Sequence, residues 1–309
     1  CLVVDTAGTP DLDALIARMQ ADAQIRTVQR MNDFQVFEVL YRDPLLPMQS
    51  ALKQINAAAA HRLSTGAGVR VGVIDSAIDS DHPDLANRLA DLRDFVGNAQ
   101  GSAAEPHGTA IAGIIAADAD NEIGMIGVAP QAQLIGLRAC WQPQGMGGRC
   151  NSFSLARALN FAILNDVHVL NMSLGGPPDP LLQELVEAAE AAGMIVVAAW
   201  GESPEPTFPA SLPGVIAAGH GTERQIPAPA VDVISAAPHN DYRYVSGSSV
   251  AAAHVSGVVA LLRARHHDLA APDIAHALHG AVVMHGDVPM VDACEALRAV
   301  EASAPACHD

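Results

Sequence analysis

Alternating strand and helix signals dominate this chain of 309 residues from Val69 onward. Short apolar runs suited to buried strands are followed by segments with helical spacing, and the order repeats. Such alternation predicts an α/β fold, a mostly parallel sheet with helices on both faces. Functional side chains are then expected at the carboxyl ends of the strands. The strands are expected near residues 70–75, 133–139, 167–172, 194–199 and 214–218, and the helices near 107–118, 152–164, 180–192 and 249–264.

Three of these predicted elements each have a polar residue at one end, and the three residues are of different types. Asp75 ends a strand, and His107 and Ser249 each stand at the start of a helix of small residues. Nucleophilic acyl transfer needs a hydroxyl, a base that takes its proton and a buried acid that orients the base. The first turn of a helix also has unpaired N–H groups that favour developing negative charge. Taken alone, Ser248 or Ser249 is better explained as a helix cap, which is the usual role of such serines.

The three stretches resemble the subtilisin-like serine proteases. V-G-V-I-D-S-A-I-D-S-D-H-P-D-L around Asp75 matches the pattern D-[ST]-G-I-D-x-x-H-P-D-L, and H-G-T-A-I-A-G begins at His107. Ser249 lies in G-S-S-V-A-A-A-H-V-S-G, with alanine where the family has proline before the histidine. The chain order Asp, His, Ser is the order that subtilisin uses. The resemblance implies a serine endopeptidase that works through an acyl-enzyme, with Asp75, His107 and Ser249 as orienting acid, base and nucleophile.

The resemblance also implies where an extended peptide would bind. One segment would pair with the peptide as an added strand, and a second would form the opposite wall of the primary pocket. Trp200 stands where the family usually has a small residue, so a narrowed or partly covered pocket is expected. Phe208-Pro209 corresponds to a step that is often cis in the family. The implied substrate-binding residues are Ser173, Leu174, Gly175, Ala199, Trp200 and Gly201.

Glu202 departs from the family where catalysis is most sensitive. The family has asparagine at this position, and its side chain donates a hydrogen bond to the tetrahedral oxyanion. An ionised glutamate only accepts hydrogen bonds, and the loss of one such donor typically costs on the order of 10²–10³ in rate. Three interpretations remain: a protonated Glu202 that donates, a rerouted loop in which Ser203 or a backbone amide donates, or a weak or inactive enzyme. The alternative function is therefore a protease-like protein that binds extended peptides without cleaving them.

The acidic segment D-A-D-N-E-I-G-M, residues 118–125, resembles the family's strong calcium loop. Carboxylate, amide and carbonyl oxygens at irregular spacing suit a hard cation, and a solvated acidic loop is the plainer alternative. The implied cofactor is structural Ca²⁺, and its implied ligands are Gln49, Asp84, Asn121, Ile123 and Met125.

Charge and cysteines limit the partners and the compartment. A net charge of −17 argues against nucleic acid and anionic membrane surfaces, and no apolar run reaches the roughly 20 residues of a membrane span. Two pairs of cysteines bracket short loops: Cys140 with Cys150, and Cys294 with Cys307. This spacing predicts two disulfides and therefore a secreted or periplasmic protein. Free thiols in a reducing compartment are the alternative. The fifth, Cys1, would be the anchored residue of a bacterial lipoprotein, or the chain is truncated before it.

The N-terminal region has a pattern of its own. Residues 1–45 predict a small βαββ unit, with a helix from Pro10 to about Ala23 and strands near 25–30 and 33–40. This unit resembles part of the inhibitory propeptide of the family, which implies an intramolecular inhibitor. A plain N-terminal extension is the alternative. Residues 46–309 then form the subtilisin-like domain.

Overall fold

The computed structural model divides the chain into two compact units, Cys1–Val39 and Leu40–Asp309. Tyr41 to Leu45 belong to the larger unit, where the backbone N–H of Leu45 donates to the carbonyl of Gly124 at 2.7 Å. The structure describes residues 3–4, 6, 9, 11–30, 41–97, 104–142, 148–201, 203, 205, 207–219, 224–301 and 307.

The smaller unit has one described helix, α1 (Leu12–Gln20). The side chain of Asp11 caps its N-terminus by accepting from the backbone N–H of Ala14 at 2.9 Å. No residue of α1 is buried, so its apolar positions do not cover a sheet within the described residues. Residues 25–30, expected as a strand, are irregular here, and the strand expected at 33–40 lies outside the described residues.

A seven-stranded parallel sheet forms the centre of the larger unit. Its inner strands are mostly apolar because both faces are covered, as expected for parallel strands, whereas the edge strand formed by residues 89–94 is largely polar and exposed. The chain first adds strands on one side of β1 and then continues on the other side, so the direction of strand addition reverses beside β1. The strand order is β2 (Leu89–Asp94), β3 (Gln133–Arg138), β1 (Arg70–Asp75), β6 (Val169–Met172), β7 (Ile195–Ala199), β8 (Ile216–Gly219) and β9 (Gln225–Pro227).

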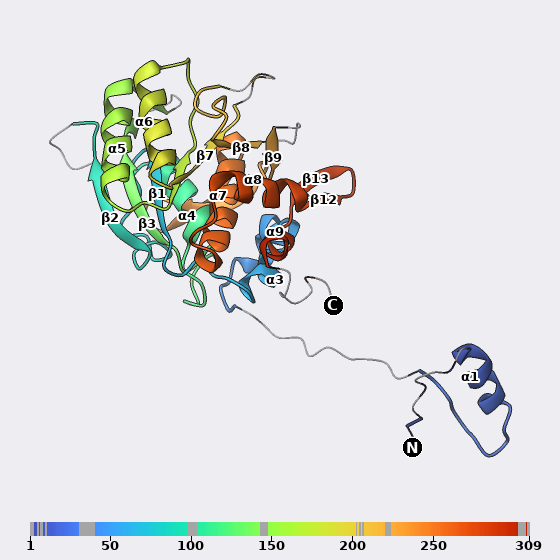
Figure 1. Ribbon diagram of the computed structural model, residues 1–309. Coiled ribbons are helices and arrows are strands. Elements are labelled where there is room, and N and C mark those ends of the chain that lie inside the picture. The colour runs from blue at the N-terminus through green and yellow to red at the C-terminus, as the bar shows by residue number, and fades with distance from the viewer. Residues whose placement is uncertain are drawn as a thin grey trace. The chain divides into compact units, whose positions relative to one another are not determined.

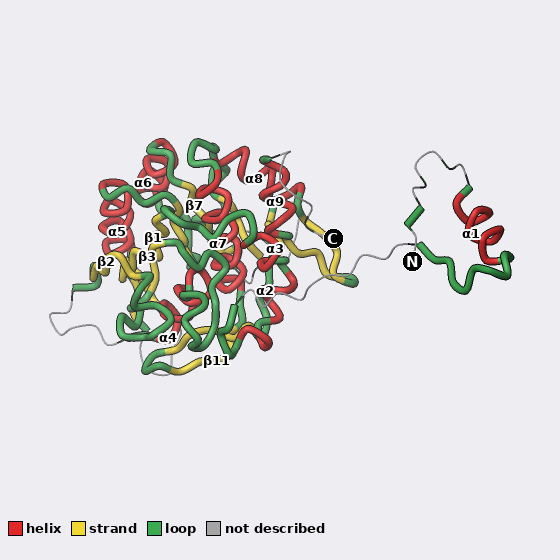
Figure 2. Tube along the Cα trace, turned by 90° about the horizontal axis from the view of Figure 1, so that it is seen from below, coloured by secondary structure: helices red, strands yellow, loops and turns green. Residues whose placement is uncertain are grey.

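Helices cover both faces of this sheet, as Figures 1 and 2 show. The helices α5 (Ser152–Leu164) and α6 (Pro180–Ala191) pack on one face, and α4 (Pro106–Ala116) and α7 (Ser248–Arg265) pack on the other. Alternate residues of β7 enter the two cores, with Val197 on the α7 side and Val196 on the α5 side. The predicted α/β fold is confirmed.

Shorter elements complete the larger unit. They were not predicted one by one. Most are runs of two to five residues, which give weak periodic signals, and the two longer helices at residues 271–280 and 293–300 were also not predicted. They are η1 (Leu46–Met48), α2 (Ser50–Gln54), α3 (Ala57–His61), β4 (Cys140–Trp141), β5 (Arg149–Cys150), β10 (Val233–Ala237), β11 (Asp241–Val245), α8 (Ala271–Gly280), β12 (Val282–His285), β13 (Val288–Val291) and α9 (Ala293–Val300).

Both predicted disulfides are present. Cys140 and Cys150 are joined across the antiparallel pair β4–β5, and Cys294 in α9 is joined to Cys307. Cys1 lies outside the described residues. Among the described helices, none has both the length and the apolar character that crossing a membrane requires.

Candidate active site

Asp75 is the last residue of β1, next to the point where strand addition reverses. Its side chain is 5% exposed, and its Oδ1 accepts a hydrogen bond from the backbone N–H of Ser76 at 2.6 Å. A carboxylate that ends a buried parallel strand is held at the carboxyl edge of the sheet, where α/β proteins bind their ligands. The sheet therefore presents one fixed acid at this edge.

His107 lies in the first turn of α4 and faces Asp75. Its Nδ1 lies 2.8 Å from Oδ1 and 2.9 Å from Oδ2 of Asp75. Because an ionised carboxylate only accepts, Nδ1 carries the proton and Nε2 is left as the basic nitrogen. The Asp75 charge raises the pKa of His107 above 6.5, more than burial lowers it. The backbone can approach this closely because Gly108 has no side chain, where a Cβ would lie 2.3 Å from the Ser76 carbonyl oxygen.

Ser249 is the second residue of α7, and a glycine precedes the helix. Gly247 has φ of +134°, a conformation that other residues rarely adopt, and it turns the chain from β11 into α7. The N–H groups of the first helical turn have no partner within the helix, and the dipole is positive there. Ser249 and His107 line the same pocket. Of the predicted triad, Asp75 and His107 are thus joined by hydrogen bonds, and Ser249 shares their pocket.

A buried chain of hydrogen bonds holds the start of α7 against the loop after β6. Ser256 donates to the side-chain oxygen of Asn171 at 2.9 Å, and Asn171 donates to the hydroxyl of Ser173 at 3.0 Å. Ser173 in turn donates to the carbonyl of Ser249 at 3.0 Å. The predicted peptide-pairing segment, which begins at Ser173, is therefore fixed relative to the predicted nucleophile.

The two predicted walls of the primary pocket are joined by Thr207. Its backbone N–H donates to the carbonyl of Trp200 at 3.3 Å, and a Cβ on Gly175 would lie 2.3 Å from its hydroxyl oxygen. Gly176 and Phe208 exchange backbone hydrogen bonds at 2.9 and 3.1 Å. The peptide bond between Phe208 and Pro209 is cis, as predicted.

The large side chain of Trp200 does not cover the predicted primary pocket. The residue is 6% exposed, and its indole packs in the core on the α5 and α6 side of the sheet with Phe208 and Ala217. Adjacent residues of an extended chain face opposite ways, so Ala199 faces the α7 side while Trp200 faces away from it. The expected narrowing of the pocket by the Trp200 ring is therefore wrong. Glu202, which follows this strand, lies outside the described residues.

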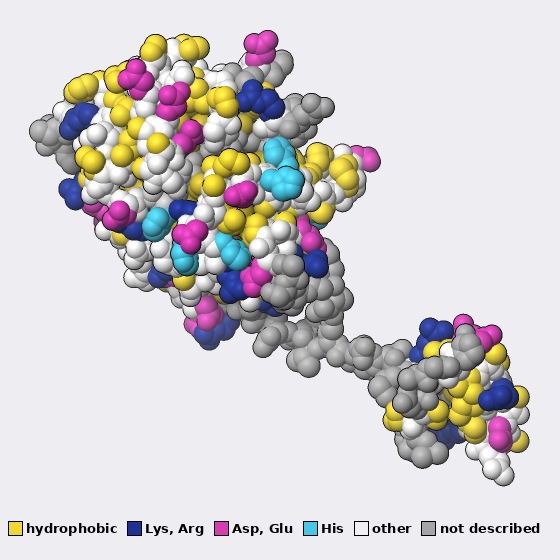
Figure 3. Space-filling model, in the orientation of Figure 1, with side chains coloured by type: hydrophobic (Ala, Val, Ile, Leu, Met, Phe, Trp, Pro, Cys, Tyr) yellow, Lys and Arg dark blue, Asp and Glu magenta, His cyan; other side chains and the backbone are white. Residues whose placement is uncertain are grey.

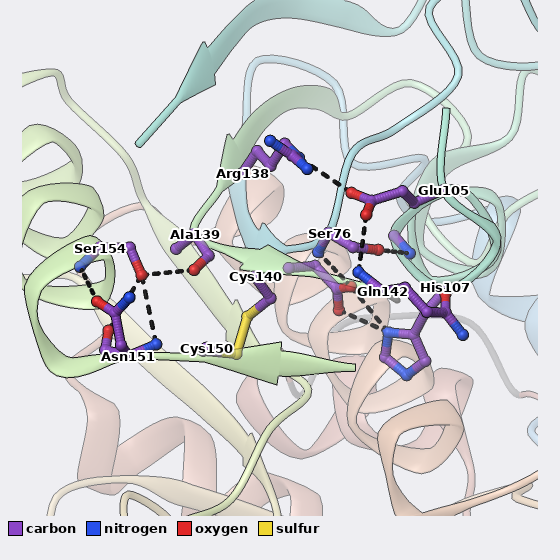
Figure 4. Close-up of a disulfide and its surroundings, with 12 residues drawn as sticks. Ser76, Glu105, His107, Arg138, Ala139, Cys140, Gln142, Cys150, Asn151 and Ser154 are labelled. Atoms are coloured by element: carbon purple, nitrogen blue, oxygen red, sulfur yellow. Dashed lines mark hydrogen bonds and ion pairs between the residues drawn. A yellow bond between two sulfur atoms is a disulfide. The ribbon is translucent and has the colours of Figure 1, made fainter. Parts of the chain in front are cut away.

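Glu105 was missed by the sequence analysis, and it joins three parts of the site. Its carboxylate accepts from the backbone N–H groups of Ala77 and Gln142 at 2.8 Å each, and from the Arg138 guanidinium at 3.0 Å. Figure 4 shows this carboxylate between Arg138 and Gln142, with His107 alongside. Burial alone would raise the pKa of Glu105, but Arg138 and the two N–H groups lower it below its ordinary value. The only sequence signal is an acid immediately before the helix that begins at Pro106.

The predicted calcium ligands do meet at one loop. Asp84 accepts from the Asn121 amide, the Met125 N–H and the Tyr242 hydroxyl, at 2.8 to 2.9 Å. Gln49 exchanges two hydrogen bonds with the backbone of Ile126. A cation between Asp84 and Asn121 would replace the hydrogen bond that the Asn121 amide donates.

Asp43 adds a second buried carboxylate near this loop. It is 3% exposed; Oδ2 accepts from the N–H of Asp120 at 2.8 Å, whereas the buried Oδ1 has no hydrogen-bond partner among the described residues. Burial raises the pKa of Asp43, and the charge of Asp84 raises it further. Two carboxylates, one with an unpartnered oxygen, together with amide and carbonyl oxygens form a donor set that fits a hard cation. Asp43 was absent from the predicted ligands.

The fold and site together define a class. A buried acid at a strand end, a histidine oriented by it and a serine at a helix start, on a parallel sheet, are the arrangement of an α/β serine hydrolase. The sequence profile described as the subtilase family matches residues 66–235 and 225–282. The chain belongs to the subtilase family.

Characterised relatives agree with this assignment. The chain is 34% identical over 274 residues to M-protease of Shouchella clausii. The aligned region covers 83% of this chain and 66% of M-protease. It is 37% identical over 233 residues to subtilisin BL of Lederbergia lenta, covering 70% and 84% of the two chains. An intracellular serine protease of Paenibacillus polymyxa is 31% identical over 272 residues, covering 78% and 82%. The chain thus spans about two thirds of the length of M-protease.

Proposed function

We propose that this chain is a serine endopeptidase. The observation that carries the proposal is the contact of His107 Nδ1 with both oxygens of buried Asp75, with Ser249 in the same pocket. In the proposed reaction the Ser249 hydroxyl oxygen attacks the peptide carbonyl carbon while its proton passes to Nε2 of His107. Asp75 stabilises the imidazolium that forms. His107 then protonates the leaving amine, and water hydrolyses the acyl-enzyme by the same proton transfers in reverse.

The oxyanion would be stabilised first by the backbone N–H of Ser249, at the positive end of α7. Glu202 is proposed to complete the hole in its protonated form, because only then does it donate a hydrogen bond. The substrate is proposed to be an extended peptide that pairs with Ser173, Leu174 and Gly175 and lies against the wall of Ala199 to Gly201. The alternative of an inactive peptide-binding protein gains no support from Trp200, whose indole lies in the core.

Structural Ca²⁺ is proposed for the loop near Asp84, with Asp43 as an added ligand. When bound, the cation would neutralise the two buried carboxylates and stabilise the fold.

The region before residue 46 is proposed as an intramolecular inhibitor. An extracytoplasmic location is proposed, because two disulfides persist only where the environment is oxidising. A lipid anchor at Cys1 stays a prediction.

Hydrolysis of an internally quenched peptide tests the proposed activity. Purified protein should cleave it, and Ser249→Ala, prepared in the same way, should show no cleavage above background. Equal cleavage by both proteins would assign the activity to a contaminant or to another residue.

A further inference from the structure

The pocket that His107 and Ser249 share also contains an arginine. The pocket has a volume of about 230 Å³, and Gln142, Arg243 and Val245 line it beside the two predicted catalytic residues. The acyl part of a peptide is predicted to lie against residues 173–175 and 199–201, and none of these residues lines this pocket. A peptide that crosses Ser249 has its acyl part against those walls, so the opposite side receives the leaving group. The pocket therefore lies where the first residues after the cleaved bond would bind.

The strand β11 fixes the direction of Arg243. It pairs antiparallel with β10, with Arg243 opposite Ser235 and Val245 opposite Val233. Because alternate residues of a strand share a face, Arg243 and Val245 both line the pocket, whereas Tyr242 turns the other way and donates to Asp84 at 2.8 Å. The packing of Tyr242 therefore holds the register that brings Arg243 to the pocket.

Arg243 has no carboxylate partner within 4.0 Å among the described residues, although the chain carries a net charge of −17. Arg138, by contrast, is paired with both Asp94 and Glu105. Gln142 supplies a second unused group, because its buried Oε1 accepts no hydrogen bond from the described residues. A cation and an unused acceptor beside the catalytic pair form a site for a peptide segment that has one carboxylate and one N–H to donate.

We propose that Arg243 binds a carboxylate on the leaving-group side of the scissile bond, while Gln142 accepts a backbone N–H of the same segment. The inference rests on the proposed endopeptidase function and adds a substrate class to it. The carboxylate comes from a glutamate or aspartate in the first two positions after the cleaved bond, or from the free C-terminus of a short substrate. Arg243 would act on specificity and not on the chemical step.

A matched peptide series tests the proposal. Three quenched peptides would share one cleaved bond and carry Glu with a C-terminal amide, Gln with an amide, or Gln with a free carboxylate on the leaving-group side. The value of kcat/KM would be measured at low ionic strength for wild type, Arg243→Gln, Arg243→Glu and the control Arg62→Gln. Arg62 is exposed and lines no part of the pocket, so its variant removes the same charge elsewhere.

The wild type and Arg62→Gln should prefer at least one carboxylate peptide over the neutral one. Arg243→Gln should reduce that preference by about twofold to fivefold, the range expected for one partly exposed charge pair, and Arg243→Glu should reverse it. A preference that is absent in wild type, or that is equal in Arg243→Gln and Arg62→Gln, overturns the proposal. Preference for the Glu peptide would identify a side-chain carboxylate as the group bound, and preference for the Gln peptide with a free carboxylate would identify the C-terminus.

Failure of the endopeptidase function gives a different result, because no peptide of the series would then be cleaved. In that case the same peptides, labelled with a fluorophore, would be titrated into Ser249→Ala with and without Arg243→Gln, and anisotropy would report their Kd. Tighter binding of the carboxylate peptides that is lost with Arg243 supports the subsite even without catalysis. Equal Kd values for all peptides contradict it.

Discussion

His107 can act as a base only when it is neutral, and Asp75 sets the pH at which this occurs. The Asp75 charge raises the pKa of His107 above 6.5, so the imidazole is protonated at low pH and becomes a base as the pH rises through the raised pKa. A protonated Glu202 would lose its proton at higher pH. We therefore expect a bell-shaped profile of kcat/KM between the two values.

Replacing Glu202 with asparagine tests the upper limb of that profile. An amide donates at every pH, so Glu202→Asn should be faster than wild type at neutral pH and should extend activity to the alkaline side. The measurement is kcat/KM against pH on one peptide, with Glu205→Gln as a control that removes a charge from the same loop. Coincident profiles for wild type and Glu202→Asn would mean that another group fills the oxyanion hole.

The sequence predicted the functional residues that occur in a motif. It did not predict residues whose partners are brought together only when the chain folds. Asp75 and His107 were predicted and lie in contact, because their order and flanking residues match a known pattern. Glu105 could not be predicted, since its three partners come from separate segments of the chain. The effect of Trp200 on the pocket was misjudged because the face on which its side chain lies depends on the strand that it follows, β7.

At the scale of elements, Glu105 connects β1, β3 and α4 through one carboxylate. It fixes the segment after Asp75, the start of the helix that bears His107, and Gln142, the residue that follows β4. Its effect on the reaction would come through the position of His107, so Glu105 is a positioning residue.

Glu105→Gln should lower kcat by about tenfold with little change in KM, because the amide turns one N–H donor against a backbone N–H and leaves Arg138 with Asp94 as its one remaining charge partner among the described residues. The acid limb of the pH profile should also move, since the contact between His107 and Asp75 changes. Asp94→Asn is the control, because it removes the other partner of Arg138 and leaves the backbone contacts intact. A variant with a lower Tm but unchanged kcat and pH profile would show that Glu105 is only structural.

The loop near Asp84 gives a prediction about calcium. Saturating Ca²⁺ should raise Tm relative to EDTA by about 5–10 °C at roughly 100 times its Kd. Asp43→Asn should diminish this rise and should not lower Tm in EDTA, because it removes the repulsion between two buried carboxylates. Glu122→Gln, an exposed acid of the same loop, should keep the rise. A full calcium effect in Asp43→Asn would exclude Asp43 as a ligand.

At the scale of the whole molecule, the fold class and the main strands and helices were predicted from periodicity, whereas the order of the strands in the sheet was not predicted and is set by packing. Short apolar runs that alternate with segments of helical spacing predicted the sheet and its main helices, whereas β2 was missed because it is largely exposed and polar. The face of the larger unit seen in Figure 3 mixes acidic, basic and hydrophobic side chains.

Removal of residues 1–39 tests the role of the smaller unit. If this unit inhibits the larger one, protein beginning at Leu40 should cleave a peptide faster than the full chain, and the separate N-terminal peptide should restore inhibition. The boundary follows the division between the two compact units. Equal rates for both proteins, with equal Tm values, would reduce the N-terminal region to a plain extension.

Phosphonylation by a fluorophosphonate probe tests the central claim most directly, because an activated serine oxygen bonds covalently to the phosphorus of the probe and displaces fluoride. Intact-protein mass spectrometry should show one adduct, and digestion should place it on Ser249. The rate should rise with pH as His107 loses its proton, and it should fall strongly in Asp75→Asn. An adduct that persists in Ser249→Ala, or wild-type protein that forms none between pH 6 and 9, would contradict the assignment of this chain as a serine endopeptidase.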